Sequence, residues 1–215
     1  MEPTDQNRRA WDEIHRSRTR AAAEQLLIPK QIVELMPEVE GKHVLHLLCA
    51  TGEGTAQLVE LGALVTAVDP SSEEIEIARE RAPDVAYFQA DVHELPLELH
   101  RSRFDFVFTG GDMLESIRDL DRWLAGIVTA LKPGGALLLY DSHPVTQRID
   151  PLGHWRDNYF DSSEERPWRL EEVVDAVLAA GLRLTKLAEY QTFYRGLQRD
   201  RRVPWDFALI AEKPA

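Results

Sequence analysis

Short apolar runs alternate with amphipathic segments along this 215-residue chain. Short apolar runs at 44–48, 64–68, 85–89, 104–108 and 136–140 are typical of strands buried on both faces, and the run at 64–68 contains β-branched residues, which strands favour. Segments 120–131 and 170–178 instead place apolar residues at the i, i+3, i+4 spacing of one helical face, and Gly181 follows the second as a C-cap. Further strands are expected at 182–187 and 206–211. The order predicts an α/β protein whose helices cover a sheet.

Small residues follow the first predicted strand, where Cys49-Ala50-Thr51-Gly52-Glu53-Gly54 must turn the backbone sharply into a helix. The second strand ends at Asp69, whose carboxylate can accept two hydrogen bonds from a ribose diol. The chain thus passes from a strand through a glycine turn and a helix to a second strand that ends in an acid. This order predicts a site for the adenosine half of a cofactor.

Two departures from the dinucleotide fingerprint narrow the choice of cofactor. A G-x-G-x-x-G pattern started at Gly52 lacks its third glycine, which disfavours NAD and FAD. Glu53 would also place a negative charge beside the helix N-terminus that a pyrophosphate needs. A cofactor without phosphates therefore fits better.

Three further segments, together with this turn, resemble the class I S-adenosylmethionine-dependent methyltransferases of small molecules, from about residue 44 to the C-terminus. They are Gln-Ala-Asp-Val at 89–92, Phe-Asp-Phe-Val-Phe-Thr-Gly-Gly at 104–111, and Leu-Lys-Pro-Gly-Gly at 131–135 before another apolar strand. The resemblance implies a Rossmann-like, doubly wound, seven-stranded sheet, mostly parallel with an antiparallel last strand. We expect one domain overall, with an N-terminal helical lid segment at 1–40 and the methyltransferase domain at 41–215.

The resemblance also implies the residues that bind S-adenosyl-L-methionine: His46, Leu48, Cys49, Ala50, Gly52, Asp69, Pro70, Asp91, Val92, Thr109 and Gly110. Asp91 would accept from the adenine amine, and the loop after 104–108 would close over the methionine end. The first motif departs from the family pattern, because His46, Leu48 and Ala50 replace its usual acid and two glycines. A neutral imidazole at His46 could orient the turn only by hydrogen bonding. The alternative is a protein that binds S-adenosylmethionine or S-adenosylhomocysteine without methyltransferase activity.

Acceptor contacts are expected in the irregular segment 141–167, beyond the fifth strand. Methyl transfer to an O, N or C atom mainly requires the acceptor to be held in line with the sulfonium, and some acceptors also need a general base. His143 is the first candidate for that base and Tyr159 a weaker one. The acids and amides near the strand ends do not predict a metal site.

A net charge of −12 disfavours a nucleic-acid partner, and the longest apolar runs fall short of a membrane span. Cys49 is the only cysteine, which rules out an intrachain disulfide, and the N-terminus lacks the pattern of a signal peptide. We therefore expect a cytoplasmic enzyme, monomer or homodimer, acting on a small-molecule substrate.

Overall fold

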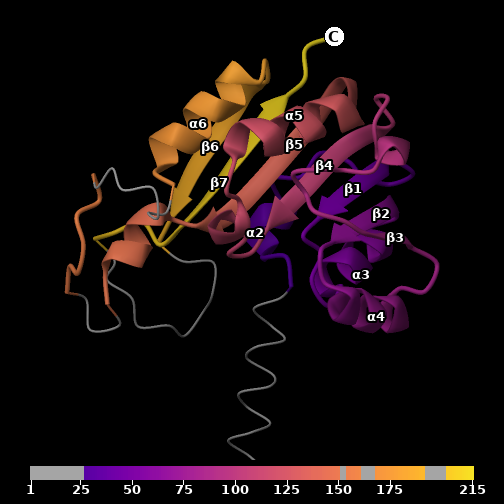
Figure 1. Ribbon diagram of the computed structural model, residues 1–215, viewed down its shortest axis with the longest axis horizontal. Helices are drawn as coiled ribbons and strands as arrows, with labels where there is room; N and C mark the ends of the chain where they lie inside the picture. Colours follow the sequence, from indigo (N-terminus) through magenta and orange to yellow (C-terminus); the bar gives the residue numbers. More distant parts are fainter. Residues whose placement is uncertain (1–26, 151–153, 161–167, 192–201) are drawn as a thin grey trace, which may run out of the picture.

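A computed structural model describes residues 27–150, 154–160, 168–191 and 202–215. Within these residues a seven-stranded sheet has the order β3-β2-β1-β4-β5-β7-β6 (Figure 1). Its strands are β1 His43–Leu47, β2 Leu64–Asp69, β3 Ala86–Gln89, β4 Phe104–Gly110, β5 Leu131–Ser142, β6 Arg183–Tyr190 and β7 Asp206–Glu212. Strands β1 to β5 pair in parallel, whereas β7 runs antiparallel to both β5 and β6. The predicted sheet, with its antiparallel last strand, is confirmed.

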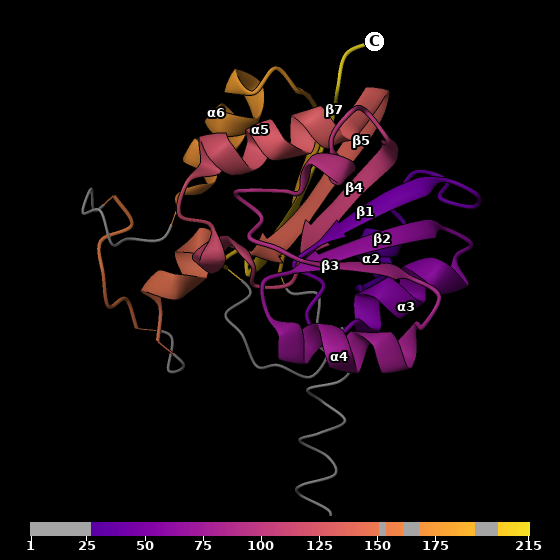
Figure 2. The ribbon, with the colours of Figure 1, turned by 45° about the vertical axis from the view of Figure 1, so that its right-hand side comes forward.

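Helices cover both faces of this sheet, as Figure 2 shows. α3 (Glu53–Glu60) and α4 (Ser72–Arg81) lie on one face, and α5 (Leu120–Ala130) and α6 (Leu170–Ala179) lie on the other. The apolar stripe predicted for α5 is buried and includes Trp123, which has no exposed surface. The described residues also form three 3₁₀ turns: η1 Leu97–Leu99, η2 Leu114–Ser116 and η3 Pro144–Arg148.

A short helix, α2 (Lys30–Val33), precedes the sheet and packs on the face that carries α3. Ile28 and Ile32 are buried there. The N–H of Ile28 donates to Gln57 Oε1 of α3 at 2.9 Å. This part of the predicted lid segment thus packs into the core, while residues 1–26 lie outside the described residues and their lid role stays a prediction.

The Pro-Gly-Gly sequence at 133–135 marks an irregularity rather than a separation between helix and strand. β5 begins at Leu131, directly after α5, and its pairing with β4 shifts register between Phe104 and Phe106. Gly134 has φ +77°, as expected of a glycine turn. The turn is therefore absorbed into the strand as a bulge.

Candidate functional site

The turn between β1 and α3 holds three residues in the left-handed region of the backbone: Leu48 (φ 54°), Ala50 (φ 46°) and Gly52 (φ 85°). Residues with a Cβ pay roughly 1–2 kcal/mol for this conformation, and glycine does not. Gly52 is also required by space, because an added Cβ would lie 2.6 Å from the Cβ of Ala78 in α4. The backbone geometry of a glycine turn is thus kept although two of its glycines are replaced.

Asp69, the last residue of β2, is hydrogen-bonded to this turn. Its Oδ2 accepts from the N–H of Ala50 at 2.9 Å and its Oδ1 from the N–H of Ser71 at 2.9 Å. The residue is only 3% exposed. Each carboxylate oxygen has a second lone pair, so the group can fix the turn and still accept further hydrogen bonds.

Acidic neighbours extend from Asp69 toward the first turn of α4. Burial, followed by the adjacent Asp69 carboxylate, raises the pKa of Glu74 above its usual range. In a capping box the Glu at this position would bond the N–H of the N-cap residue, here Ser71. That N–H is already donated to Asp69. Glu74 is therefore displaced from its usual capping partner and lies against Asp69 instead.

Arg81 of α4 clamps the same turn from its other side. It donates to the carbonyl oxygen of Thr51 at 2.8 Å and pairs with Glu53 at 2.8 Å. Thr51 Oγ1 donates to the same carboxylate at 2.6 Å. Because Glu53 is neutralised by Arg81, the predicted repulsion of a negatively charged ligand is weaker than its charge alone suggests.

A small cavity of about 60 Å³ opens at the carboxyl ends of β1 and β4. Five of the predicted cofactor residues line it, namely His46, Leu48, Cys49, Ala50 and Gly110. Ile28, Glu53, Gly54, Phe108, Gly111 and Tyr140 complete the wall. Ligands of α/β sheets bind at this edge, so the cavity marks the candidate site.

His46 and Cys49 contribute uncharged groups to this wall. Burial lowers the pKa of His46 to about 3, so its imidazole is neutral at physiological pH. Its Nδ1 lies 2.8 Å from Thr55 Oγ1, and its ring packs against Phe108 at 5.2 Å between centroids. Burial and the nearby Asp69 raise the pKa of the Cys49 thiol to about 12.

The predicted adenine residues follow β3, the neighbouring strand. Asp91 Oδ1 accepts from the N–H of His93 at 2.9 Å, and that bond lowers the pKa of Asp91. Its side chain is 65% exposed, in contrast to buried Val92. Pro70 lies nearby on the surface, where its carbonyl oxygen accepts from Gln89 at 3.3 Å. These residues lie outside the small cavity, along the same edge of the sheet.

The loop after β4 is held against the end of β5. Gly110 approaches Tyr140 so closely that an added Cβ would lie 2.2 Å from its carbonyl oxygen. Asp141 Oδ2 accepts from the N–H groups of Met113 and Leu114, each at 2.9 Å. Burial raises the pKa of Asp141 to about 8. The buried hydroxyl of Thr109 lacks a hydrogen-bond partner among the described residues.

His143 and Tyr159, the predicted catalytic residues, both take part in local structure. Nδ1 of His143 accepts from the N–H of Val145 at 3.1 Å, and Nε2 lies 3.1 Å from Glu189 Oε1. The imidazole therefore has both nitrogens engaged. The hydroxyl of Tyr159 accepts from the N–H of Leu170 at 3.2 Å, at the start of α6. None of these contacts joins His143 to Tyr159.

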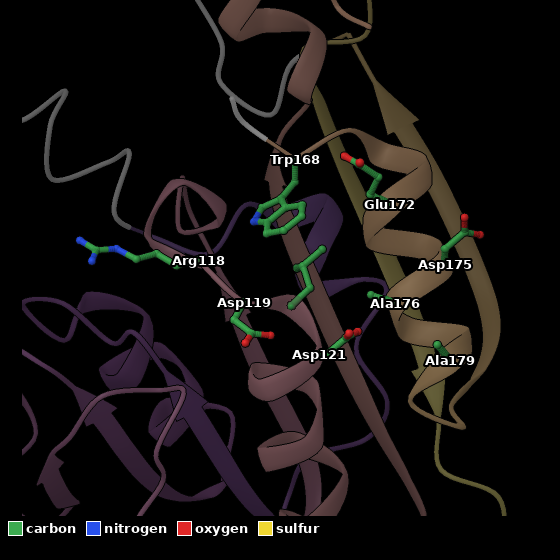
Figure 3. A pocket seen from close by; sticks show the side chains of 9 residues that line it. Arg118, Asp119, Asp121, Trp168, Glu172, Asp175, Ala176 and Ala179 are labelled. Carbon is green, nitrogen blue, oxygen red and sulfur yellow. The ribbon is translucent and has the colours of Figure 1, made fainter. Parts of the chain in front are cut away.

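A separate groove of about 490 Å³ lies between α5 and α6 (Figure 3). Two of its four acidic residues are used in local structure: Asp119 caps α5 through the N–H of Arg122, and Glu172 pairs with Arg169. Trp168 donates to the carbonyl oxygen of Ile117 at 2.6 Å at the edge of this groove. The groove is therefore a feature of helix packing on one face of the sheet.

The described residues contain neither a membrane-spanning helix nor a metal-binding cluster. None of their helices is both long and apolar enough to cross a bilayer. No group of three or more His, Cys, Asp or Glu side chains in the same part of the chain could hold a metal ion.

Several site residues could not be recognised from the sequence. Glu74 and Arg81 belong to a charged helix, whose sequence predicts a solvent-exposed surface. Only the folded structure brings them to the turn between β1 and α3. Tyr140 falls within an apolar strand, so the sequence predicts a core residue there. The Ser at 71 with a Glu three residues later was the one available signal, since that spacing predicts a capped helix starting beside Asp69.

Comparison with known proteins agrees with this geometry. Residues 44–135 match a family model described as a methyltransferase domain. An uncharacterised methyltransferase of Synechocystis sp. is 33% identical over 104 residues, 48% of each chain. An O-methyltransferase of Penicillium expansum is 31% identical over 147 residues, 62% of this chain and 51% of the relative. The chain thus spans about half the length of these curated relatives.

The fold has solved counterparts over most of the chain. A crystal structure of a putative S-adenosylmethionine-dependent methyltransferase from Listeria monocytogenes superimposes with a TM-score of 0.73 at 21% identity, covering 91% of this chain and 100% of that one. The matched family model and the shared fold lead to one conclusion: residues 44–135 are similar to a methyltransferase domain, within a chain that has the fold of known S-adenosylmethionine-dependent methyltransferases.

Proposed function

We propose that this protein binds S-adenosylmethionine at the carboxyl edge of the sheet and methylates a small-molecule acceptor. The observation that carries the proposal is the left-handed turn at Leu48, Ala50 and Gly52, fixed from below by Asp69 and open to a cavity at the ends of β1 and β4. Such a turn brings backbone rather than side chains close to a ligand.

The residues at this edge of the sheet fit the two halves of the cofactor, its methionine end and its adenosine, at separate places. The cavity of about 60 Å³ is far smaller than a complete ligand site, typically about 300–1,000 Å³, and suits the methionine end alone. Gly110, Leu48 and Ala50 would line that end. Asp69 and Pro70 would hold the ribose along the open edge, and Asp91 with Val92 would hold the adenine.

The bound cofactor would supply a methyl group on a positively charged sulfur. The protein's part is to position the acceptor and exclude water, because in-line transfer needs little covalent help. The aromatic pair Phe108 and Tyr140, with ring centroids 5.7 Å apart, and the neutral His46 give the cavity an apolar wall. A general base at His143 would require release of its bond from Val145, so that role stays a prediction.

Oxygen is the acceptor atom that we propose first, because the relative from Penicillium expansum is named an O-methyltransferase. A second candidate function is cofactor binding without methyl transfer. The specific observation in its favour is Leu48, which lines the cavity at a position where the family pattern has a glycine.

Calorimetric titration of the purified protein with S-adenosylmethionine and S-adenosylhomocysteine tests the proposal, with NADH as the control ligand. Micromolar binding of the first two ligands and none of NADH is expected. A panel of hydroxylated, amine and acidic-carbon acceptors with methyl-labelled cofactor then separates enzyme from binding protein. Absence of binding by both cofactor forms would contradict the proposal, and binding without transfer to any acceptor would favour the second candidate.

A further inference from the structure

Arg148 closes the 3₁₀ turn η3, directly beyond the end of β5. The residue is only 6% exposed. Its buried Nε has no hydrogen-bond partner, and its guanidinium forms no ion pair with any described residue. Arginine is almost never buried so fully without a partner, because removing its charge from water is costly.

The carboxylates on neighbouring segments are committed elsewhere. Asp150 pairs with Arg156 and also accepts from the N–H of His154 at 2.9 Å. Asp141 accepts from three backbone N–H groups, including that of Ser142 at 2.7 Å. Glu115 accepts from Gln147 at 2.8 Å. Each of these acids already serves a bond that the fold uses, and none of them forms an ion pair with Arg148.

Unmet hydrogen-bonding capacity is concentrated on η3. Of the five buried side-chain atoms without a partner in the described part of the chain, two belong to this turn: Nε of Arg148 and Oε1 of Gln147. The turn is otherwise well fixed, since His143 caps it and the carbonyl oxygen of Arg148 accepts from the N–H of Arg156 at 2.8 Å. A rigid turn with an unpaired guanidinium is typical of a binding group awaiting its ligand rather than of a loose surface residue.

The position of η3 relates this group to the proposed reaction. β5 carries Tyr140, which lines the cavity, and its end leads directly into η3. Gln147 of this turn donates to Glu115, in the loop that follows β4, so η3 lies at the carboxyl edge of the sheet. Ile149, the next residue, pairs with Trp155, whose indole is 58% exposed. A guanidinium and an exposed aromatic ring therefore flank the expected acceptor side.

We propose that Arg148 binds a negatively charged group, a carboxylate or a phosphate, on the methyl acceptor, so that this enzyme acts on anionic small molecules. A guanidinium matches both groups through paired, charge-assisted hydrogen bonds. The identity of this ligand as the acceptor rests on the proposed function, whereas the anion site itself does not.

Benzoate, phenyl phosphate and the neutral isostere benzamide are suitable probes, titrated by calorimetry and thermal melting with and without S-adenosylhomocysteine. The wild-type protein is expected to bind at least one anion about tenfold or more tighter than benzamide, with a rise in melting temperature. The two anionic probes distinguish a carboxylate site from a phosphate site.

Three variants identify the residue responsible. Arg148→Met should lose the preference for anions and melt at the same temperature as the wild type or higher, because an unpaired buried charge is removed. Arg148→Lys should keep part of the preference, since the charge remains without the planar fork. Arg156→Gln is the matched control, a nearby arginine that is already paired with Asp150, and should keep all of it.

Equal binding of benzamide and both anions, or an unchanged preference in Arg148→Met, would overturn the proposal. So would a large fall in melting temperature of Arg148→Met without any response to anions, because the charge would then be neutralised within the chain. S-adenosylhomocysteine should bind Arg148→Met as it binds the wild type. Failure of that ligand to bind the wild type would count against the proposed function alone.

Discussion

Asp69 and Ala50 are joined by a hydrogen bond of 2.9 Å, from the N–H of Ala50 to Oδ2 of Asp69. The bond connects the tip of β2 to the turn after β1 and holds Ala50 in the left-handed region. The carboxylate predicted to bind a ribose thus also shapes the turn that the methionine end would meet. Stability and ligand binding are coupled in this one side chain.

Asp69→Asn should therefore reduce both properties. Loss of charge-assisted bonds, each worth about 1.5–3 kcal/mol, is expected to weaken S-adenosylmethionine binding at least tenfold and to lower the free energy of unfolding. Calorimetry and urea unfolding measure the two effects. Asp119→Ala, which removes the N-cap of α5, should cost about 1 kcal/mol of stability and leave the affinity unchanged. Unaltered affinity in Asp69→Asn would show that the ribose lies elsewhere.

Ala50→Gly should stabilise the protein by about 0.5–1 kcal/mol. Relief of the left-handed strain, roughly 1–2 kcal/mol, exceeds the entropic cost of glycine, about 0.5–1 kcal/mol. Ala56→Gly in α3 is the matched control and should destabilise by about 1 kcal/mol, because its backbone is helical. Chemical unfolding of both variants decides the matter, and destabilisation by Ala50→Gly would argue against strain in the turn.

Asp141→Asn should change how stability depends on pH. Burial raises the folded-state pKa of Asp141 from 3.8 to about 8, so the neutral acid is favoured in the native protein. Its contribution is fully present below about pH 4 and is lost as pH rises toward 8, by about 1.4 kcal/mol for each pH unit. The stability of the wild type relative to Asp141→Asn should fall over this range. Parallel pH profiles of the two proteins would refute the raised pKa.

Gly110→Ala tests the contact between the loop after β4 and Tyr140. Because the new Cβ would lie 2.2 Å from a backbone oxygen, the loop must move, and a loss of about 1–3 kcal/mol is expected from overpacking alone. Gly134→Ala is the control for backbone strain without a clash, since its Cβ would meet nothing within 4 Å. A smaller loss of stability in Gly110→Ala than in Gly134→Ala would contradict the close approach.

Strands and helices could be predicted from the sequence because their patterns are local. The apolar run at 64–68 and the amphipathic spacing from Leu120 to Leu131 set the elements to within a few residues. The Pro-Gly-Gly turn could not be placed within β5, because its pairing with β4 through a register shift depends on the partner strand. Periodicity does not encode such shifts.

Candidate site residues could be predicted only where position along the chain implies position in the fold. Asp69 ends a strand, so its place at the carboxyl edge follows directly. Glu74 and Arg148 are different, because the environment of Glu74 comes from its tertiary contact with Asp69 and the burial of Arg148 comes from how the folded chain packs around η3. A charged residue in a polar segment carries no sign of how deeply the fold will bury it.

The position of β7 between β5 and β6 has a consequence for how the chain folds as it is synthesised. β6 emerges first but has no described strand to pair with until β7 arrives, because β7 alone contacts both β5 and β6. Until then β5 presents an open edge beside the future site, and such edges recruit other chains. Lys213, just after β7, completes the arrangement by donating to the carbonyl oxygens of Val128 and Leu131 at the end of α5. Completion of the sheet beyond β5 is therefore a late, nonlocal event during translation, and until β7 is made the edge of nascent β5 is open to pairing with other chains.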